Sequence, residues 1–393
     1  MEAHEEFERL YCKTKKKKPD IFESFCPYRV CPLGAHVDHQ HGLVTGFALD
    51  QGVRIVYAAT AGVVRLKSMN FEKEKSFHIA RIPSPQHDWA DYLRGAAWSL
   101  NRRFELKRGV NCVVEGSLPI GGLSSSAAVI IAFLTALCKV NNIRVSRADL
   151  IDIAFEAETR YVGVSVGKLD QSCEVYSQKD KLLFLDTKNG KYELVAPGPK
   201  TPPFEIAIFF SGIERSLARS PFNIRVDELK AAAYALKGWA DMEYDVFEES
   251  RLRDVPLAVF EKYADRLPDN WRKRARHYYG EVERVKQGVE YWSQGNLKKF
   301  GQLVFESGNS SIHNYETGSA ELRALYEIML ETDGVYGGRF SGAGFKGCCM
   351  ALVDPAKRDA IAQKTTNEYL RAFPNLEGLF SIRFCQTADG VQY

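Results

Sequence analysis

The segment that most constrains this chain is a glycine- and serine-rich stretch, residues 116–128, which leads directly into an apolar run. It reads Gly-Ser-Leu-Pro-Ile-Gly-Gly-Leu-Ser-Ser-Ser-Ala-Ala. The stretch from Ser124 to Lys139 is apolar all round and contains neither Gly nor Pro, which predicts a helix buried in a core. The fold must therefore enclose this helix and present the glycine- and serine-rich loop at its N-terminus.

This loop has the properties of an anion-binding site. Glycines allow backbone N–H groups to turn inward around an anion, and a helix N-terminus adds unpaired donors and positive potential. Serine hydroxyls at this point are also hard oxygen donors of the kind that Mg²⁺ prefers. Capping of the helix by one serine is the alternative, but three serines followed by two alanines exceed what a cap needs. The loop therefore predicts phosphate binding.

Strands and helices do not alternate simply along the chain. Strands are expected at 54–64, 109–114, 181–185, 192–195, 204–210, 348–353 and 379–385. Helices are expected at 148–160 and over 226–330, with breaks near Pro256, Pro268 and Gly295.

Four prolines between residues 197 and 203 suggest a domain boundary near residue 200. The pattern of elements predicts an α+β chain of two lobes. We expect an N-terminal arm at 1–22, an N-terminal lobe at 23–200 and a C-terminal lobe at 201–393.

A second glycine-dense segment, residues 338–349, reads Gly-Arg-Phe-Ser-Gly-Ala-Gly-Phe-Lys-Gly-Cys-Cys. It contains G-x-G-x-x-G, but an apolar strand-like run follows where a dinucleotide-binding fold needs a helix. Neither glycine segment contains the Lys-Ser/Thr of a Walker loop, and the chain has no HRD or DFG motif, which excludes a protein kinase. What remains is a hairpin in which backbone approaches a ligand, or a tight structural turn.

A third segment, residues 28–42, concentrates Arg29, His36, Asp38, His39 and His41 between apolar residues. Such polar density suggests a polyol site. The His39-Gln-His41 spacing is a weak metal pattern, so a metal site is the less favoured interpretation.

Charge, cysteine content and hydropathy exclude several other classes. A net charge of +3 is too small to indicate nucleic-acid binding. The nine cysteines include no CxxC pair and are expected to be buried thiols of a reducing compartment. The N-terminus lacks an apolar signal region, and the apolar runs are too short to cross a membrane. We therefore expect a cytoplasmic protein with no membrane or nucleic-acid partner.

The three segments, in this order, resemble the three motifs of the GHMP kinase superfamily and, within it, the galactokinase family. The similarity extends from about Ser24 to the C-terminus. It implies a two-lobed GHMP kinase fold that binds ATP and a sugar in the cleft between the lobes. Residues expected to contact ATP are Gly121, Gly122, Leu123, Ser124, Ser125, Ser126, Ala127, Gly342 and Gly344.

The resemblance also implies roles for individual residues. Ser126 resembles the serine that ligates Mg²⁺, and Glu158 has the spacing of the second ligand. Gly167-Lys-Leu-Asp-Gln resembles the family's G-I-M-D-Q, so Asp170 corresponds to the catalytic aspartate and Arg29 to its arginine partner. Asp170 would accept a proton from the anomeric hydroxyl, and Arg29 would stabilise charge on the transferred group.

The chain departs from the family at the sugar motif. Galactokinases read R-V-N-L-I-G-E-H-T-D, whereas residues 29–38 read Arg-Val-Cys-Pro-Leu-Gly-Ala-His-Val-Asp. The family glutamate, which accepts a hydrogen bond from the sugar 6-hydroxyl, is Ala35. Its removal clears charge and volume for a C6 carboxylate, and this version of the motif resembles the galacturonokinases. We therefore expect a 1-kinase of D-galacturonic acid, with His41 or Lys168 as partner of the carboxylate.

The remaining sugar contacts are carried over unevenly. His36, Asp38 and Gly167 match sugar-binding positions, whereas Phe222 replaces a family tyrosine and loses its hydroxyl contact. Arg215 and Arg225 are either anion partners or solvated helix charges, the latter being favoured.

Three alternatives remain for the function: a galactokinase, a kinase of another uronic acid, or a sugar sensor without turnover. A sensor is disfavoured because every catalytic position of the motifs is present. A monomer or weak homodimer is expected.

Overall fold

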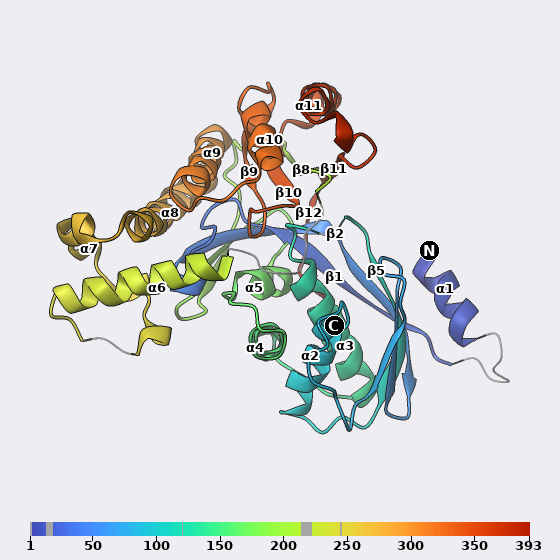
Figure 1. Cartoon of the computed structure of the whole chain (residues 1–393). Helices are drawn as coiled ribbons and strands as arrows, with labels where there is room; N and C mark the ends of the chain where they lie inside the picture. The colour runs from blue at the N-terminus through green and yellow to red at the C-terminus, as the bar shows by residue number, and fades with distance from the viewer. Residues whose placement is uncertain (1, 13–18, 120, 214–221, 244–245) are drawn as a thin grey trace.

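The computed structural model describes residues 2–12, 19–119, 121–213, 222–243 and 246–393. Within these residues the strands form two sheets, each accompanied by helices (Figure 1). The eight strands of the first sheet have the order β4-β3-β5-β2-β6-β7, and β1 and β12 also pair with β2. Their bounds are β1 Phe22–Val30, β2 Leu43–Thr60, β3 Val63–Ser68, β4 Lys75–His78, β5 Gly109–Gly116, β6 Leu182–Asp186, β7 Tyr192–Val195 and β12 Thr387–Ala388. Pairing is antiparallel except between β3 and β5.

The long strand β2 shows why this sheet has helices on both faces. Along a strand, successive side chains point to opposite faces. Ile55 and Tyr57 accordingly belong to the main core, whereas Val56 and Ala58 pack with Phe7 of helix α1 (Glu2–Tyr11) on the other face. The strand predicted at 54–64 is thus the end of β2 and the start of β3.

The apolar helix predicted at 124–139 is α3 (Ser125–Asn141), and it is buried over most of its length, as expected. It packs on β1, β2 and α2 (Asp91–Asn101). The helix predicted at 148–160 is α4 (Arg147–Glu156), which continues into the π-helical turn η2 (Ala157–Val162). Helix α5 (Leu169–Tyr176) completes this group.

The second sheet is antiparallel with the order β11-β8-β10-β9. Its strands are β8 Glu205–Phe210, β9 Val335–Phe340, β10 Cys348–Val353 and β11 Ser381–Cys385. The strands β9 and β10 form a hairpin around the second glycine segment, so the prediction of a strand after those glycines is confirmed.

The helices of this half are α6 Phe222–Trp239, α7 Leu257–Tyr263, α8 Asp269–Ser293, α9 Leu297–His313, α10 Ala320–Leu330 and α11 Arg358–Ala372. Pro256 and Pro268 directly precede α7 and α8, and Gly295 lies between α8 and α9, so the three predicted breaks are confirmed. Short 3₁₀ turns are η1 Asp38–Gln40, η3 Phe247–Glu249, η4 Leu252–Asp254, η5 Ala264–Arg266, η6 Pro355–Lys357 and η7 Pro374–Leu376.

The two halves of the chain are joined by more than the segment near residue 200. Strand β12, at the C-terminal end of the chain, pairs with β2, and the C-terminal residues lie beside the helices of the N-terminal half (Figure 1). Trp292 of α8 is buried against Phe47 of β2 and donates a hydrogen bond to the Val195 carbonyl at 2.9 Å. The largest core therefore contains residues from both sides of the expected boundary.

The N-terminal segment differs from the arm expected at 1–22. Ala3 and Phe7 of α1 are fully buried against β2 and β5, because the amphipathic helix presents its apolar side to the sheet. The Lys15–Lys18 run lies outside the described residues. All nine cysteines are free and buried, as expected. Among the described helices none has the length and apolar character that a membrane span requires.

Candidate active site

The residues predicted to carry the chemistry meet although they are far apart in the chain. Arg29, near the end of β1, donates from Nε to Asp170 Oδ1 at 2.7 Å, and from Nη1 to the Gly122 carbonyl at 3.2 Å. Asp170 lies in the first turn of α5. Burial alone would lower the pKa of Arg29, but the adjacent Asp170 carboxylate raises it above its usual value. A fixed cation therefore lies directly beside a carboxylate at the glycine- and serine-rich loop.

Ser124 distinguishes the two interpretations of the serine loop. Its hydroxyl does not cap α3; it donates to the second oxygen of Asp170, Oδ2, at 2.5 Å. Ser124 has φ 61, in the left-handed region, and precedes the first residue of α3. The simple capping interpretation is therefore wrong for Ser124, and both oxygens of Asp170 are held by polar partners.

Ser126 and Glu158 form a second pair of oxygen groups. The Ser126 hydroxyl donates to Glu158 Oε1 at 2.7 Å, and Gln171 Nε2 donates to Oε2 at 2.8 Å. Burial, reinforced by the nearby Asp170 charge, raises the pKa of Glu158 to about 7. A buried carboxylate beside a hydroxyl at a helix N-terminus suits a divalent cation, because the cation's charge would replace the proton.

The two glycine segments pack backbone against backbone. A Cβ added to Gly122 would lie 2.7 Å from Cys348 Sγ, and one added to Gly342 would lie 2.7 Å from the Gly122 Cα. Ser341 donates to the Gly122 carbonyl at 2.6 Å. Gly121 and Gly347 also approach closely, since a Cβ added to Gly121 would lie 3.1 Å from the Gly347 Cα. These positions therefore need glycine because any side chain would separate the two loops. The sequence did not reveal this packing requirement.

The sugar motif forms a buried loop between β1 and β2. His36 is buried with φ 60, and burial lowers its pKa well below the usual range, so its ring is neutral. Asp38 accepts the backbone N–H of Leu169, the residue before Asp170, and burial raises its pKa to about 6. A Cβ on Gly167 would lie 2.4 Å from Asp38 Oδ2. Gly167 thus makes room for Asp38 beside helix α5.

Aromatic rings surround His36. Tyr315 stacks on it with ring centroids 4.4 Å apart and an interplanar angle of 9°, and the ring of Phe222 lies at 6.3 Å. Tyr315 also hydrogen-bonds His39 at 3.3 Å through its hydroxyl. Within the part of the chain that the structure describes, His36 Nε2 has no hydrogen-bond partner. Sequence reasoning missed Tyr315, because no motif marks a residue 279 positions from its ring partner.

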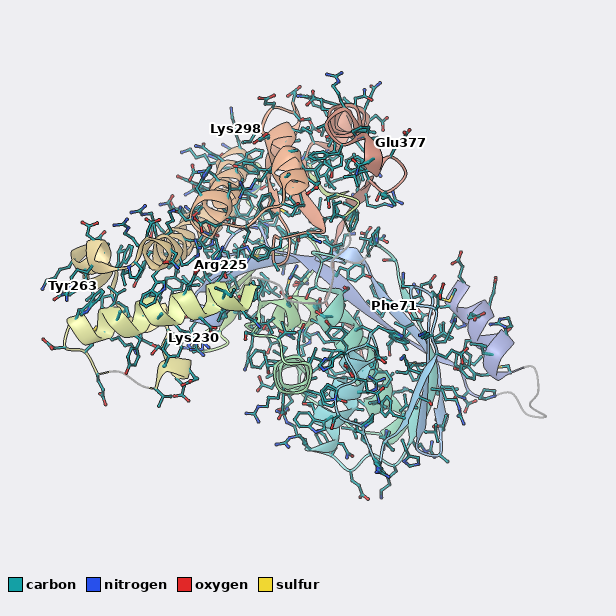
Figure 2. The ribbon with its side chains drawn as sticks, viewed as in Figure 1. Phe71, Arg225, Lys230, Tyr263, Lys298 and Glu377 are labelled. Carbon is teal, nitrogen blue, oxygen red and sulfur yellow. The ribbon has the colours of Figure 1, made fainter. Side chains whose placement is uncertain are left out.

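Two of the positively charged candidates, Lys168 and Arg225, have partners within the protein. Lys168 pairs with Asp152 Oδ1 at 2.6 Å and lies over the ring of Phe155, so its charge is engaged on α4. Figure 2 shows Arg225 at the end of α6 nearest to α5.

Arg225 is only 17% exposed and pairs with Glu228 at 3.2 Å, so the expectation of a solvated helix charge is wrong for it. Burial lowers the pKa of His41, which is consequently a poor cation. Arg215 lies outside the described residues.

This combination of fold and site has counterparts among known proteins. The model of the GHMP kinase N-terminal domain matches residues 91–178, and that of the GHMP kinase C-terminal domain matches residues 289–371. With these matches and relatives 38% and 31% identical over more than nine-tenths of its length, the chain belongs to the GHMP kinase family and is an ATP-dependent phosphotransferase, which confirms the predicted class of fold and enzyme.

Individual relatives refine this assignment. A galacturonokinase from Arabidopsis thaliana is 38% identical over 96% of this chain and 94% of its own length. A galactokinase from Thermococcus kodakarensis is 31% identical, covering 91% of this chain and 97% of the relative. The crystal structure of Lactococcus lactis galactokinase complexed with galactose superposes with a TM-score of 0.88 at 27% identity, over 99% of this chain and 98% of that one. Methanococcus jannaschii mevalonate kinase shares the fold, with a TM-score of 0.66 and 15% identity over 95% of this chain and 99% of its own.

Proposed function

We propose that this chain transfers the γ-phosphoryl group of ATP to the anomeric hydroxyl of D-galacturonic acid, giving galacturonate 1-phosphate and ADP. The observation that carries the chemistry is the arrangement around Asp170. Arg29 holds one carboxylate oxygen and Ser124 the other, at the mouth of a loop suited to phosphate. A carboxylate fixed in this way can receive a proton in a defined direction.

In the proposed step Asp170 accepts the proton of the anomeric hydroxyl while the hydroxyl oxygen of the sugar forms a bond to the γ-phosphorus. The bond from the γ-phosphorus to the bridging oxygen breaks, and ADP leaves with that oxygen. Arg29 stabilises negative charge on the transferred group, and the loop from Gly121 to Ala127, with Gly342 and Gly344, would contact the nucleotide. Most of the acceleration would come from alignment and electrostatics.

Ser126 and Glu158 would hold Mg²⁺, as their adjacent oxygens and the burial of Glu158 support. When bound, Mg²⁺ neutralises charge on the β- and γ-phosphates of ATP. Within the described residues no group of three or more His, Cys, Asp or Glu could hold a metal ion. Two protein ligands are nevertheless usual for Mg²⁺, which takes its other ligands from phosphates and water.

Ala35 supports galacturonate as the sugar. It corresponds to the galactokinase glutamate in the sugar motif, is 7% exposed and directly precedes the buried His36. A carboxylate at position 35 would repel a C6 carboxylate, whereas a methyl group does not. The similarity to the Arabidopsis galacturonokinase points in the same direction. The unpartnered Nε2 of His36 is a candidate donor to the sugar.

A sugar panel with coupled detection of ADP tests this proposal. Galacturonate should give a higher kcat/KM than galactose, and Ala35→Glu should move the preference toward galactose. Asp170→Asn should abolish sugar-dependent ADP release in both cases. A higher kcat/KM for galactose would instead favour galactokinase, the second candidate, which the resemblance to the galactose complex supports. Sugar binding without ADP release would identify a sensor.

The free thiols of the buried cysteines suit a reducing compartment, so we propose that the enzyme acts in the cytoplasm.

A further inference from the structure

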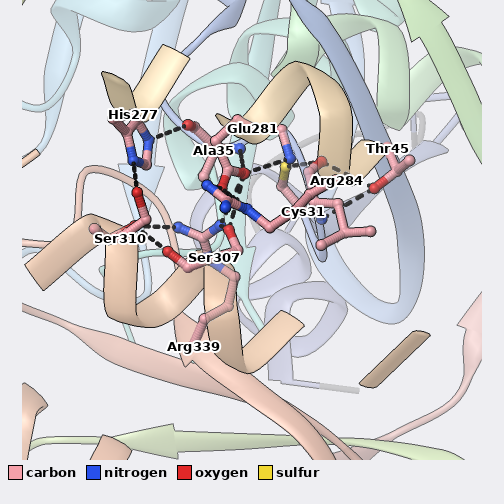
Figure 3. A network of polar contacts seen from close by, with 12 residues as sticks. Cys31, Ala35, Thr45, His277, Glu281, Arg284, Ser307, Ser310 and Arg339 are labelled. Carbon is pink, nitrogen blue, oxygen red and sulfur yellow. Dashed lines mark hydrogen bonds and ion pairs between the residues drawn. The ribbon is translucent and has the colours of Figure 1, made fainter. Parts of the chain in front are cut away.

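A buried carboxylate lies beneath the sugar motif and belongs to a different part of the chain. Glu281, on α8, is completely buried. Its Oε2 accepts the backbone N–H of Gly34 at 2.8 Å, the backbone N–H of Ala35 at 3.2 Å and the hydroxyl of Ser307 at 2.8 Å (Figure 3). One carboxylate oxygen thus receives two consecutive N–H groups of the loop that leads into His36.

The carboxylate is kept charged by two arginines. Arg284, one turn along α8, contacts Oε1 at 2.7 Å, and Arg339 of β9 lies 3.8 Å from Oε2. Burial alone would raise the pKa of Glu281, but the charges of Arg284 and Arg339 and the hydrogen bond from Ser307 contribute to lowering it to about 2. An ionised acceptor makes stronger hydrogen bonds to backbone N–H groups than a neutral one.

His277, one turn earlier on α8, holds the other side of Ala35. Its Nε2 lies 3.0 Å from the Ala35 carbonyl oxygen and its Nδ1 lies 2.9 Å from Ser310 Oγ (Figure 3). Burial lowers the pKa of His277 to about 4, so the ring is neutral and carries one proton. Since a carbonyl can only accept, the proton is on Nε2, and Ser310 donates to Nδ1.

The loop needs this external support because its conformation is unfavourable by itself. Gly34 and His36 have φ 89 and 60. A left-handed conformation is costly for a residue with a side chain unless surrounding contacts determine it. Helix α8 holds the N–H and the C=O of Ala35, the residue between the two left-handed positions, and thereby sets the direction in which the His36 ring leaves the backbone.

We propose that Glu281 and His277 are positioning residues for the sugar: they fix the Ala35 peptide groups and so place His36 and Asp38. This inference rests on the proposed function, in which those two side chains hold the sugar. It extends the sugar site beyond the motif to helix α8, which none of the three sequence motifs contains. Neither Glu281 nor His277 needs to touch the substrate.

The test is steady-state kinetics of Glu281→Gln beside Asp91→Asn. Asp91 is a comparable control, because this buried carboxylate also accepts backbone N–H groups, from Gln86 at 3.0 Å, His87 at 2.6 Å and Asp88 at 3.3 Å, and pairs with Arg94 at 2.5 Å. Both variants should lose stability. Only Glu281→Gln should raise the KM for the sugar, by about tenfold or more, since small displacements of positioning groups have large effects. Its KM for ATP should change less than threefold.

His277 provides an independent variant if Glu281→Gln does not fold. His277→Phe removes the donor to Ala35 but keeps a ring, whereas His277→Gln keeps an N–H that can reach the carbonyl. The sugar KM should rise strongly in the first variant and return toward the unmodified value in the second. Equal sugar KM values in both, or a Glu281→Gln effect no larger than that of Asp91→Asn, would overturn the proposal.

The experiment separates this inference from the proposed function. The unmodified chain is first assayed with galacturonate and galactose, and absence of turnover with either would reject the kinase proposal. If only galactose is phosphorylated, the choice of sugar is wrong, but the KM comparisons are made with galactose and still test the role of α8.

Discussion

The hydroxyl of Ser124 offers the sharpest test of how the site works. Asp170 has two oxygens, and the structure gives each a donor: Arg29 at 2.7 Å and Ser124 at 2.5 Å. Removal of the serine hydroxyl leaves the carboxylate held on one side and able to rotate. We expect the rate of phosphoryl transfer to fall, because the receiving oxygen is no longer aligned with the substrate hydroxyl.

The magnitude follows from the charge of the acceptor. A hydrogen bond to a charged group contributes about 1.5–3 kcal/mol, which corresponds to roughly a 10- to 150-fold loss of rate if the whole bond serves alignment. Because Ser124 has φ 61, alanine at this position keeps the backbone strain that the Cβ of serine already causes, whereas glycine relieves it. Ser124→Gly and Ser124→Ala should therefore show similar losses in kcat, while Ser124→Ala should be less stable.

Coupled ADP release at saturating ATP and sugar measures kcat, and urea unfolding measures stability. Thr135→Ala is the control. Thr135 lies on α3, the helix that Ser124 precedes, and its buried hydroxyl donates to the Ala132 carbonyl at 2.8 Å and does not contact Asp170. The variant should be destabilised yet retain kcat. If both Ser124 variants keep kcat within threefold of the unmodified chain, the idea that Ser124 aligns the carboxylate is refuted.

Three further outcomes are expected. Gly122→Ala should lose about 2–4 kcal/mol of stability in urea unfolding, because its φ is 87 and the new Cβ would meet Cys348, whereas Gly163→Ala, with φ 85 and open space, should lose only the conformational part, about 1 kcal/mol; equal losses would contradict the packing argument. Glu158→Gln should raise the Mg²⁺ concentration required for half-maximal activity by about 10- to 100-fold in a titration at fixed ATP, as expected for loss of a metal ligand, and an unchanged requirement would exclude Glu158 as a ligand. The depressed pKa of Glu281 should add roughly 3 kcal/mol of stability that is fully present above pH 4.5 and is lost as the pH falls toward 2; urea unfolding between pH 6 and pH 3 should therefore show a steeper loss for the unmodified chain than for Glu281→Gln, and parallel curves would refute the assignment.

Local pattern predicted many of the elements. The apolar run of α3, the strands at β5, β6, β7 and β8, and the breaks before α7 and α8 all follow from periodicity and from Gly and Pro. The sequence did not predict β1, α2, β9 or α11, nor the docking of α1. Strand β1 is the instructive case, because it contains a Pro and the charged Arg29, both unusual in a buried strand. The burial of Arg29 is explained only by its ion pair with Asp170, which is distant in the sequence.

The sequence alone was enough to predict which types of residue form the candidate site and what chemistry they favour. Glycines and serines before an apolar helix indicate phosphate binding, and the motif around Asp170 resembles that of the family. The contacts of those residues were decided only by tertiary structure. Ser124 could cap its helix or orient Asp170, and the choice depends on α5 lying beside α3. The hydrogen bonds between α8 and Ala35 could not be predicted from the sequence either, because they join positions about 240 residues apart that come within reach only when the chain folds.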